Sequence, residues 1–322
     1  MKAVVIHEFG TPSVLEYVEC AKPNISAGEL LIHAKYTSVN FADVKNRTGN
    51  KAKGNFPMIL GLDAAGVVEE VFDETSAFKK GDRVIAFPKN GSYAEYVIAN
   101  EQLVFKIPHD LSFEKAAAIP TVSFLAYILT HKVMKVSEAD AVLIHAASGG
   151  VGTMLVQMAK QLGAKKIIGV VGNMDKANIV YELGADTVLT YDNFSQQVNE
   201  YTDGYGVDIV FDSIAGDVTE ESLNCLAQYG TLVQFGNSGG RAGNIKTSDL
   251  HSSCRNVKGF SLGTTRKLKP EMLQTVAGEI FALLKSEDLQ VPIAKTYRLE
   301  EMQEAHKFME SRQHQGKILI KI

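Results

Sequence analysis

The spacing of hydrophobic positions changes near residue 120. Before this point the apolar runs are short and separated by glycine, proline and polar residues, as in residues 30–36, 66–71, 83–87 and 93–98. Several short strands bounded by such turn residues are typical of a small β-barrel or β-sandwich. We therefore expect residues 1–120 to form a β-rich lobe.

From about residue 121 short apolar runs alternate with stretches of helical spacing. Strands are predicted at residues 141–146, 166–171, 188–190, 207–211 and 231–235, and helices at 151–162, 175–183, 194–201 and 217–227. This alternation predicts βαβ units, hence an α/β domain with a doubly wound parallel sheet and helices on both faces.

The last part of the chain departs from this alternation. Residues 271–285 and 299–311 have helical spacing, and residues 316–322 form a terminal strand that we expect to return to the first lobe. The predicted organisation is a discontinuous domain of residues 1–120 and 261–322 around a central domain of residues 121–260.

A glycine-rich segment, AASGGVG at residues 146–152, lies between a predicted strand and a predicted helix. Glycines in this place allow a tight turn and a close approach of the backbone to a pyrophosphate, which the unpaired N–H groups of the helix then bind. A tight turn without a ligand is the alternative. The surrounding βαβ pattern favours a dinucleotide site.

The end of the next predicted strand bears on the choice of dinucleotide. Folds that bind NAD usually have an acidic residue there, which accepts hydrogen bonds from the ribose. Here the strand is followed by Gly172 and Asn173, and Lys176 lies close by. A lysine taken alone is more simply a solvated helix residue. With no acid to repel a 2′-phosphate, however, Lys176 can attract one, so we predict NADP(H).

Composition excludes several classes of protein. The chain of 322 residues fits two domains, and its net charge of −4 gives no electrostatic basis for binding nucleic acid or anionic lipid. Its three cysteines, Cys20, Cys225 and Cys254, are too few and too widely spaced for a disulfide framework or a local zinc knuckle. No apolar run approaches about 18 residues, and the N-terminal run is too short for a signal sequence. We expect a cytoplasmic protein.

Four further segments, at residues 39–47, 56–68, 78–84 and 91–96, carry a resemblance when they are taken with the glycine-rich turn. Their order and spacing resemble the medium-chain dehydrogenase/reductase superfamily and, within it, the zinc-independent quinone oxidoreductase (zeta-crystallin-like) group. The resemblance implies a GroES-like lobe, a Rossmann domain that binds NADP(H), and a homodimer formed through the Rossmann domain. It also implies hydride transfer from NADPH to a quinone or another α,β-unsaturated carbonyl.

The resemblance implies roles for residues at matching positions. Asn40 and Asp43 would lie near the nicotinamide, while Gly172, Lys176 and Tyr191 would surround the 2′-phosphate. The other implied cofactor-binding residues are Ser148, Gly149, Gly150 and Val151 at the pyrophosphate, together with Ser213, Phe235, Gly236 and Lys317.

The catalytic candidates are Asn40 as a hydrogen-bond donor and Lys45 or Arg47 as an electrostatic stabiliser. Asp43 and Arg47 are four residues apart, however, so on a helix they could simply form an ion pair. For these two residues we favour that structural interpretation.

Zinc is not expected. The zinc-dependent branch of the superfamily has a cysteine where Asn40 stands and a histidine where Leu62 stands, and residues 88–108 contain no cysteine for a structural zinc lobe. The substrate stays open, because Leu125 and Lys45 occupy positions where relatives often have threonine and tyrosine. The alternatives are a reductase of enoyl thioesters or alkenals and a catalytically weak protein that binds or senses NADPH.

Overall fold

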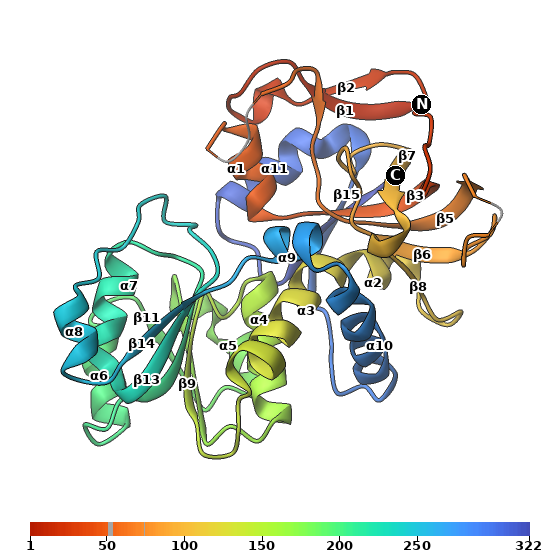
Figure 1. Cartoon of the computed structure of the whole chain (residues 1–322). Coiled ribbons are helices and arrows are strands. Elements are labelled where there is room, and N and C mark those ends of the chain that lie inside the picture. Colours follow the sequence, from red (N-terminus) through yellow and green to blue (C-terminus); the bar gives the residue numbers. More distant parts are fainter. Residues whose placement is uncertain (51–53, 74) are drawn as a thin grey trace. The chain divides into compact units, whose positions relative to one another are not determined.

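The computed structural model describes residues 1–50, 54–73 and 75–322, which divide into two compact units (Figure 1). The first unit contains Met1–Phe124, Thr265–Ala282 and Val291–Ile322, and the second contains Leu125–Thr264 and Leu283–Gln290. Residues 283–290, which we expected in the first unit, therefore belong to the second. The Gln157 side chain holds them there, donating to the Gln290 carbonyl at 2.9 Å and accepting from its N–H at 2.8 Å.

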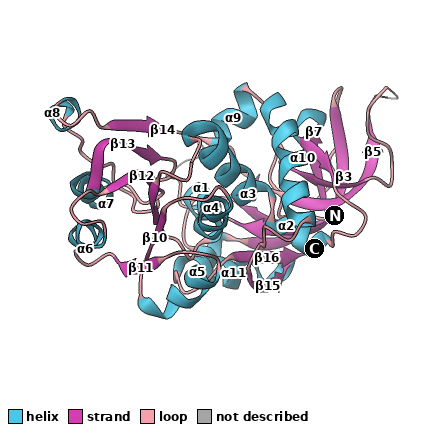
Figure 2. Ribbon diagram, turned by 90° about the horizontal axis from the view of Figure 1, so that it is seen from below, coloured by secondary structure: helices cyan, strands magenta, loops and turns pink. Residues whose placement is uncertain are grey.

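The second unit is built on a six-stranded parallel sheet in the order β11-β10-β9-β12-β13-β14. The strands are β9 (Ala141–His145), β10 (Lys166–Val171), β11 (Thr187–Thr190), β12 (Val207–Asp212), β13 (Leu226–Gln234) and β14 (Asn256–Gly259). The helices are α4 (Gly150–Gln161), α5 (Ala177–Glu182), α6 (Phe194–Tyr201), α7 (Asp217–Ser222) and α8 (Thr247–His251). Figure 2 shows α4 and α5 on one side of the sheet and α6 and α7 on the other. The predicted Rossmann-type α/β fold is confirmed.

Burial explains why these short runs become strands. All five residues of β9 are buried, as in a parallel sheet covered on both faces. On one face Leu143 and Val170 pack against Phe194 and Val198 of α6. Such apolar contacts stabilise the unit by roughly 1.5–3 kcal/mol for each fully buried large aliphatic or aromatic side chain.

The first unit contains the other ten strands of the described residues. Its larger sheet has the order β15-β16-β3-β5-β6-β8, with β7 also paired to β3, and a smaller sheet has the order β2-β1-β4. The strands are β1 (Lys2–Ile6), β2 (Glu16–Glu19), β3 (Glu29–Val39), β4 (Met58–Ile59), β5 (Ala64–Val71), β6 (Arg83–Ala86), β7 (Tyr96–Asn100), β8 (Val104–Lys106), β15 (Ile293–Arg298) and β16 (Lys317–Lys321). This is the expected GroES-like lobe. Strand β16 runs antiparallel to β3, with Ile318 opposite Val39.

The remaining α-helices of the described residues belong to the first unit or have residues in both units, and a π-helix, Ile128–Met134, lies in the second unit. Helices α1 (Phe41–Arg47), α2 (Phe113–Ala118) and α11 (Met302–Glu310) lie in the first unit, while α3 (Pro120–Tyr127), α9 (Leu262–Leu268) and α10 (Glu271–Lys285) each have residues in both. The predicted helix at 299–311 starts as a 3₁₀ turn, Leu299–Glu301, before α11. No helix in the described part of the chain is long and apolar enough to cross a membrane.

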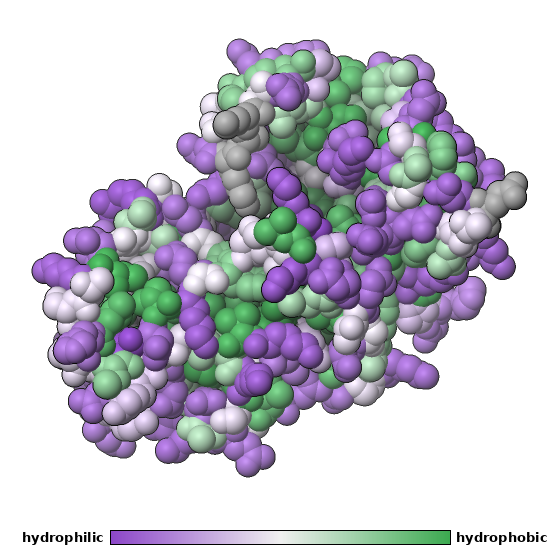
Figure 3. All heavy atoms as spheres, in the orientation of Figure 1, coloured by the Kyte–Doolittle hydropathy of each residue, from purple (hydrophilic) through white to green (hydrophobic). Residues whose placement is uncertain are grey.

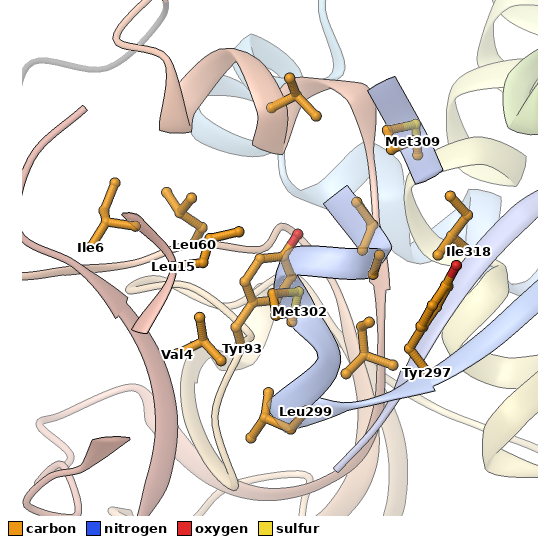
Figure 4. Close-up of a cluster of buried hydrophobic side chains, with 14 residues drawn as sticks. Val4, Ile6, Leu15, Leu60, Tyr93, Tyr297, Leu299, Met302, Met309 and Ile318 are labelled. Carbon is orange, nitrogen blue, oxygen red and sulfur yellow. The ribbon is translucent and has the colours of Figure 1, made fainter. Parts of the chain in front are cut away.

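A hydrophobic cluster in the first unit joins segments far apart in the sequence. It contains Val4 and Ile6 of β1, Met302 and Met309 of α11, and Ile318 of β16, all of them buried. Figure 4 shows Tyr93 among these side chains, next to Met302. Tyr93 is fully buried, so its hydroxyl group needs a partner inside the protein.

Candidate functional site

The predicted cofactor-binding residues of the second unit follow the ends of neighbouring strands. Ser148, Gly149, Gly150 and Val151 follow β9, Gly172 and Lys176 follow β10, Tyr191 follows β11, Ser213 follows β12, and Phe235 and Gly236 follow β13. Because the strands are parallel and adjacent, these ends share one edge of the sheet. The strand order reverses between β9 and β12, the point at which open α/β sheets bind their ligands.

The glycine-rich turn is built so that α4 starts close to the strand end. Gly149 is the N-cap of α4, and Ala146 has a left-handed backbone with φ of 50°. A Cβ atom on Gly152 would lie 2.2 Å from the Ala146 carbonyl oxygen and 2.7 Å from the Ala147 Cα atom. Only glycine therefore lets the first turn of α4 pack against this loop, as a backbone that binds a pyrophosphate requires.

Tyr191 contacts this turn directly. Its hydroxyl oxygen accepts a hydrogen bond from the Ala146 N–H at 2.9 Å. Its ring is nearly parallel to that of His145, with 5.7 Å between the ring centroids and 16° between the planes. Tyr191 thus supports the turn, while its contact with a 2′-phosphate stays a prediction.

His145, for which no motif suggested a role, is the last residue of β9 and is 1% exposed. Ser222 donates its hydroxyl proton to the Val218 carbonyl at 2.6 Å, so at 2.8 Å His145 Nε2 must donate to the Ser222 oxygen. His145 Nδ1 is buried without a partner. Burial lowers the pKa of His145 to about 4, so the ring is neutral.

The buried neutral His145 predicts that acid destabilises the second unit. Its pKa is about 4 in the fold and about 6.5 when unfolded, so only the unfolded chain binds the proton between these values. The contribution of His145 is complete above pH 6.5, and about 3 kcal/mol of it is lost as the pH falls to 4. Thermal unfolding of wild type and His145→Asn across this window should show the smaller pH dependence in the variant. Equal dependences would contradict this assignment.

In the first unit, Asn40 lies between β3 and α1 and is 7% exposed. Its Oδ1 accepts from the Lys317 ammonium at 2.7 Å, and its Nδ2 donates to Asp63 at 3.2 Å and to Ser38 at 3.3 Å. An ammonium only donates, so the orientation of the amide is fixed. Because both amide hydrogens have protein acceptors, the predicted donation to a substrate requires one of these bonds to open.

Asp63 is the acidic partner that the sequence analysis missed. It is fully buried and accepts hydrogen bonds from the hydroxyl groups of Ser38 and Thr121, both at 2.5 Å. The signal was present, because Asp63 directly follows Leu62, which stands where the zinc-dependent branch has a histidine. Lys317, predicted to bind cofactor, is 3% exposed. Burial lowers its pKa, and the nearby Asp63 and Asp43 oppose that shift.

The predicted ion pair between Asp43 and Arg47 is wrong. The buried Arg47 guanidinium pairs with Glu310 at 2.6 Å and donates through Nε to the Gly10 carbonyl at 3.0 Å. Arg47 has no exposed surface, which does not favour its predicted role as a stabiliser of substrate charge. Lys45 lies half-buried on α1, and its catalytic role stays a prediction.

A second residue that the sequence did not reveal is Arg266 of α9. It donates to the Leu62 carbonyl at 3.3 Å, and its guanidinium lies 4.8 Å from the centre of the Phe87 ring. Burial lowers the pKa of Arg266, while the charges of Asp63 and Asp43 oppose that shift. No sequence motif marks this arginine, because only the fold brings it close to Leu62 and Phe87.

Comparison with known proteins identifies both parts of the chain. Residues 26–109 match the family described as "Alcohol dehydrogenase GroES-like domain", and residues 150–278 match the family described as "Zinc-binding dehydrogenase". The chain is 34% identical to quinone oxidoreductase 1 of Escherichia coli, with 98% of each protein covered. It is 33% identical to 2-haloacrylate reductase of a Burkholderia species, covering 99% of this chain and 98% of that protein. The crystal structure of E. coli quinone oxidoreductase complexed with NADPH aligns over 100% of both chains, with a TM-score of 0.94 at 32% identity.

The name of the second family raises the question of whether zinc fits this chain. Within the described residues, no three His, Cys, Asp or Glu side chains are grouped so that they could hold a metal ion. Around Asn40, the Asp63 carboxylate already accepts from Ser38 and Thr121, and the Lys317 ammonium occupies the amide oxygen. A buried cation at this point repels a metal ion, so the donor set does not fit zinc.

Proposed function

Since this chain belongs to the medium-chain dehydrogenase/reductase superfamily, in its quinone oxidoreductase group, we propose that it is an NADPH-dependent reductase. In this proposal it transfers hydride, without a metal, to a quinone or another α,β-unsaturated carbonyl. The observation that carries the metal-free part is the buried cluster in which Lys317 and Asp63 bond to the amide of Asn40, the residue that stands where the zinc-dependent branch has a cysteine.

The edge of the parallel sheet supplies the proposed cofactor site. Bound NADPH supplies the hydride. The turn before α4 would bind the pyrophosphate, and Gly172 and Lys176 would hold the 2′-phosphate. A Cβ atom on Gly172 would meet nothing within 4 Å, so there is open space beside this residue. Ser213, Phe235 and Gly236 complete the proposed cofactor site. A Cβ on Gly236 would lie 2.8 Å from the Ser213 carbonyl oxygen.

The first unit supplies the proposed electrostatics for the substrate. Hydride addition at the β-carbon moves negative charge toward the carbonyl oxygen, and a conjugated substrate spreads that charge. A strong acid is therefore less necessary than it is for a simple ketone, and preorganised donors and positive charge can suffice. Asn40 is the proposed donor, and Lys45 remains a proposed stabiliser. The buried Lys317 and the half-buried Arg266 add positive potential.

A substrate panel tests this proposal. Purified protein should oxidise NADPH with simple quinones or with small enones, and more slowly with enoyl thioesters. Preferential turnover of thioesters or alkenals would move the chain to another branch of the superfamily. Tight NADPH binding without turnover of any member of the panel would contradict an enzymatic function and support a sensing role.

We also propose that two copies associate through the second unit. Strand β14 is the edge of the sheet, and all four of its residues are exposed. Val257 is 37% exposed and Tyr229 is 75% exposed. In Figure 3, hydrophobic residues gather on the part of this unit that carries α8, β13 and β14. An unpaired edge with apolar side chains favours pairing with another strand.

The dimer proposal predicts a mass in solution of twice 35.0 kDa. A Val257→Asp variant, which places a charge on the exposed edge, should have the mass of a single chain by light scattering. A wild-type protein that is monomeric at micromolar concentration would contradict the proposal. We further propose a cytoplasmic location. Besides the cofactor and a second copy of the chain, the proposed partner is a small-molecule substrate and not nucleic acid or a membrane, because the cysteines are sparse and the net charge is −4.

A further inference from the structure

A chain of hydrogen bonds crosses the interior of the first unit behind Asn40. It runs from Glu310 through Arg47, His306 and Tyr93 to Asp43. Arg47, His306, Tyr93 and Asp43 are all fully buried, and Glu310 is 34% exposed. Neither the sequence motifs nor the proposed chemistry gives His306 or Tyr93 a role.

The first part of this chain has a fixed direction. Arg47 Nη1 lies 3.2 Å from His306 Nδ1, and a guanidinium can only donate, so Nδ1 accepts. Burial, together with the charge of Arg47, lowers the pKa of His306 to about 3, so the ring is neutral and carries one proton. That proton must be on Nε2, which lies 3.1 Å from the Tyr93 hydroxyl oxygen and donates to it.

The second part of the chain follows from the first. Because the Tyr93 oxygen accepts from His306, its own hydrogen is available to Asp43 Oδ2 at 3.1 Å. Burial, followed by the charge of Asp43, raises the pKa of Tyr93 well above its usual value, so the hydroxyl keeps its proton. The same Oδ2 atom accepts the Asn40 N–H at 2.8 Å, the bond that caps α1.

A route for protons from the surface is the alternative interpretation of such a chain. Arg47 blocks it, because a guanidinium does not give up its proton in a protein. From Arg47 onward, through His306 and Tyr93, each donor instead points toward Asp43. We propose that His306 and Tyr93 are positioning residues, which carry hydrogen bonds of fixed direction from the Arg47 guanidinium to Asp43 and so hold Asp43 as the acceptor that fixes Asn40.

Several charged groups determine the titration of Asp43. The pKa of Asp43 is raised to about 7, chiefly by burial. The charge of Asp63 contributes to the increase, while the Asn40 N–H, the Tyr93 hydroxyl and Lys317 oppose it. The charge of Arg266 in α9 also interacts with that of Asp43. Arg47 is connected to Asp43 by the hydrogen bonds through His306 and Tyr93. Loss of the Tyr93 donor removes a bond to the charged form, so the pKa of Asp43 must rise.

The first test is the titration of the Asp43 carboxyl carbon, followed by NMR in protein labelled with ¹³C-aspartate and assigned with Asp43→Asn. Tyr93→Phe and His306→Leu should raise the pKa of Asp43 by about one unit. His306→Gln should restore the wild-type value, because its amide can accept from Arg47 and donate to Tyr93. Met309→Leu, in the same buried cluster, controls for packing and should cause no shift.

The second test is kinetic and rests on the proposed function. With NADPH and a quinone, His306→Leu should lower kcat about tenfold near pH 6.5, with a KM for NADPH within about twofold of wild type. His306→Gln should recover most of kcat. The NMR test needs no turnover, so an inactive wild type would refute the proposed function alone.

Two results would overturn the inference. One is an unchanged pKa of Asp43 in Tyr93→Phe, which removes a single oxygen atom and remains informative if His306→Leu does not fold. The other is a shift in His306→Gln as large as that in His306→Leu, because the direction of the bonds would then not matter.

Discussion

A Gly152→Ala variant is expected to lose at least about 100-fold in affinity for NADPH, equivalent to about 2.7 kcal/mol. The added methyl group would lie 2.2 Å from the Ala146 carbonyl oxygen and 2.7 Å from the Ala147 Cα atom. Both are backbone atoms, so the methyl group can be accommodated only by moving the turn or α4. Either movement displaces the N–H groups proposed to bind the pyrophosphate. Calorimetric titration with NADPH measures the effect.

Two other glycines provide matched controls. A Cβ on Gly149 would lie 3.2 Å from the same carbonyl oxygen, so Gly149→Ala should have a smaller effect on binding. A Cβ on Gly278, in α10, would meet nothing within 4 Å, so Gly278→Ala should bind NADPH as wild type does. Wild-type affinity in a folded Gly152→Ala variant would contradict the proposed role of the turn.

A Lys176→Ala variant is expected to bind NADPH about 10- to 100-fold more weakly, while its affinity for NADH changes little. The proposed bond between the ammonium and the 2′-phosphate is charge-assisted, and such bonds contribute roughly 1.5–3 kcal/mol. Lys176 closes the 3₁₀ turn Met174–Lys176 after β10, where an NAD-binding protein would usually have an acid. Parallel titrations with both cofactors measure the difference.

Two further measurements, one with added salt and one on a second lysine variant, make this test more specific. Added salt should weaken NADPH binding more in wild type than in Lys176→Ala, because ions screen the charge interaction. Lys165→Ala removes an exposed lysine from the same unit and should leave both affinities unchanged. An equal loss for NADPH and NADH in Lys176→Ala would refute the assignment of Lys176 to the 2′-phosphate.

The second unit was predictable because its strands are short and buried, with helices between them. The predicted helix at 217–227 shows the limit of that reasoning. Helix α7 ends at Ser222, and Leu226 already belongs to β13. The mostly apolar segment at its end, from Leu223 to Ala227, fits a buried helix or a buried strand equally well, and only pairing within the sheet decides between them.

In the first unit a local signal for α1 was present but unused. Asn40 followed three residues later by Asp43 resembles a capping box, and the structure contains that arrangement at the start of α1. The strands β1, β2 and β15 have weaker patterns and depend on pairing with distant partners.

The two parts of the candidate site also differed in how far the sequence could predict them. The glycine-rich turn is continuous in sequence, so spacing alone could identify it. The cluster around Asn40 joins residues separated by up to 277 positions, because β16 pairs with β3 and brings Lys317 to Asn40. Arg47 is likewise 259 positions from His306. Pairwise spacing on one helix suggested Asp43 as the partner of Arg47, but α11 provides a closer carboxylate, Glu310.

Metal-free hydride transfer from NADPH is tested by the rate of NADPH oxidation with a simple quinone after exhaustive dialysis against a chelator, with NADH measured in parallel. We expect quinone reduction to continue at the undialysed rate, added zinc not to increase it, and NADPH to be the preferred donor. Activity that disappears with the metals and returns with zinc would refute a metal-free reaction.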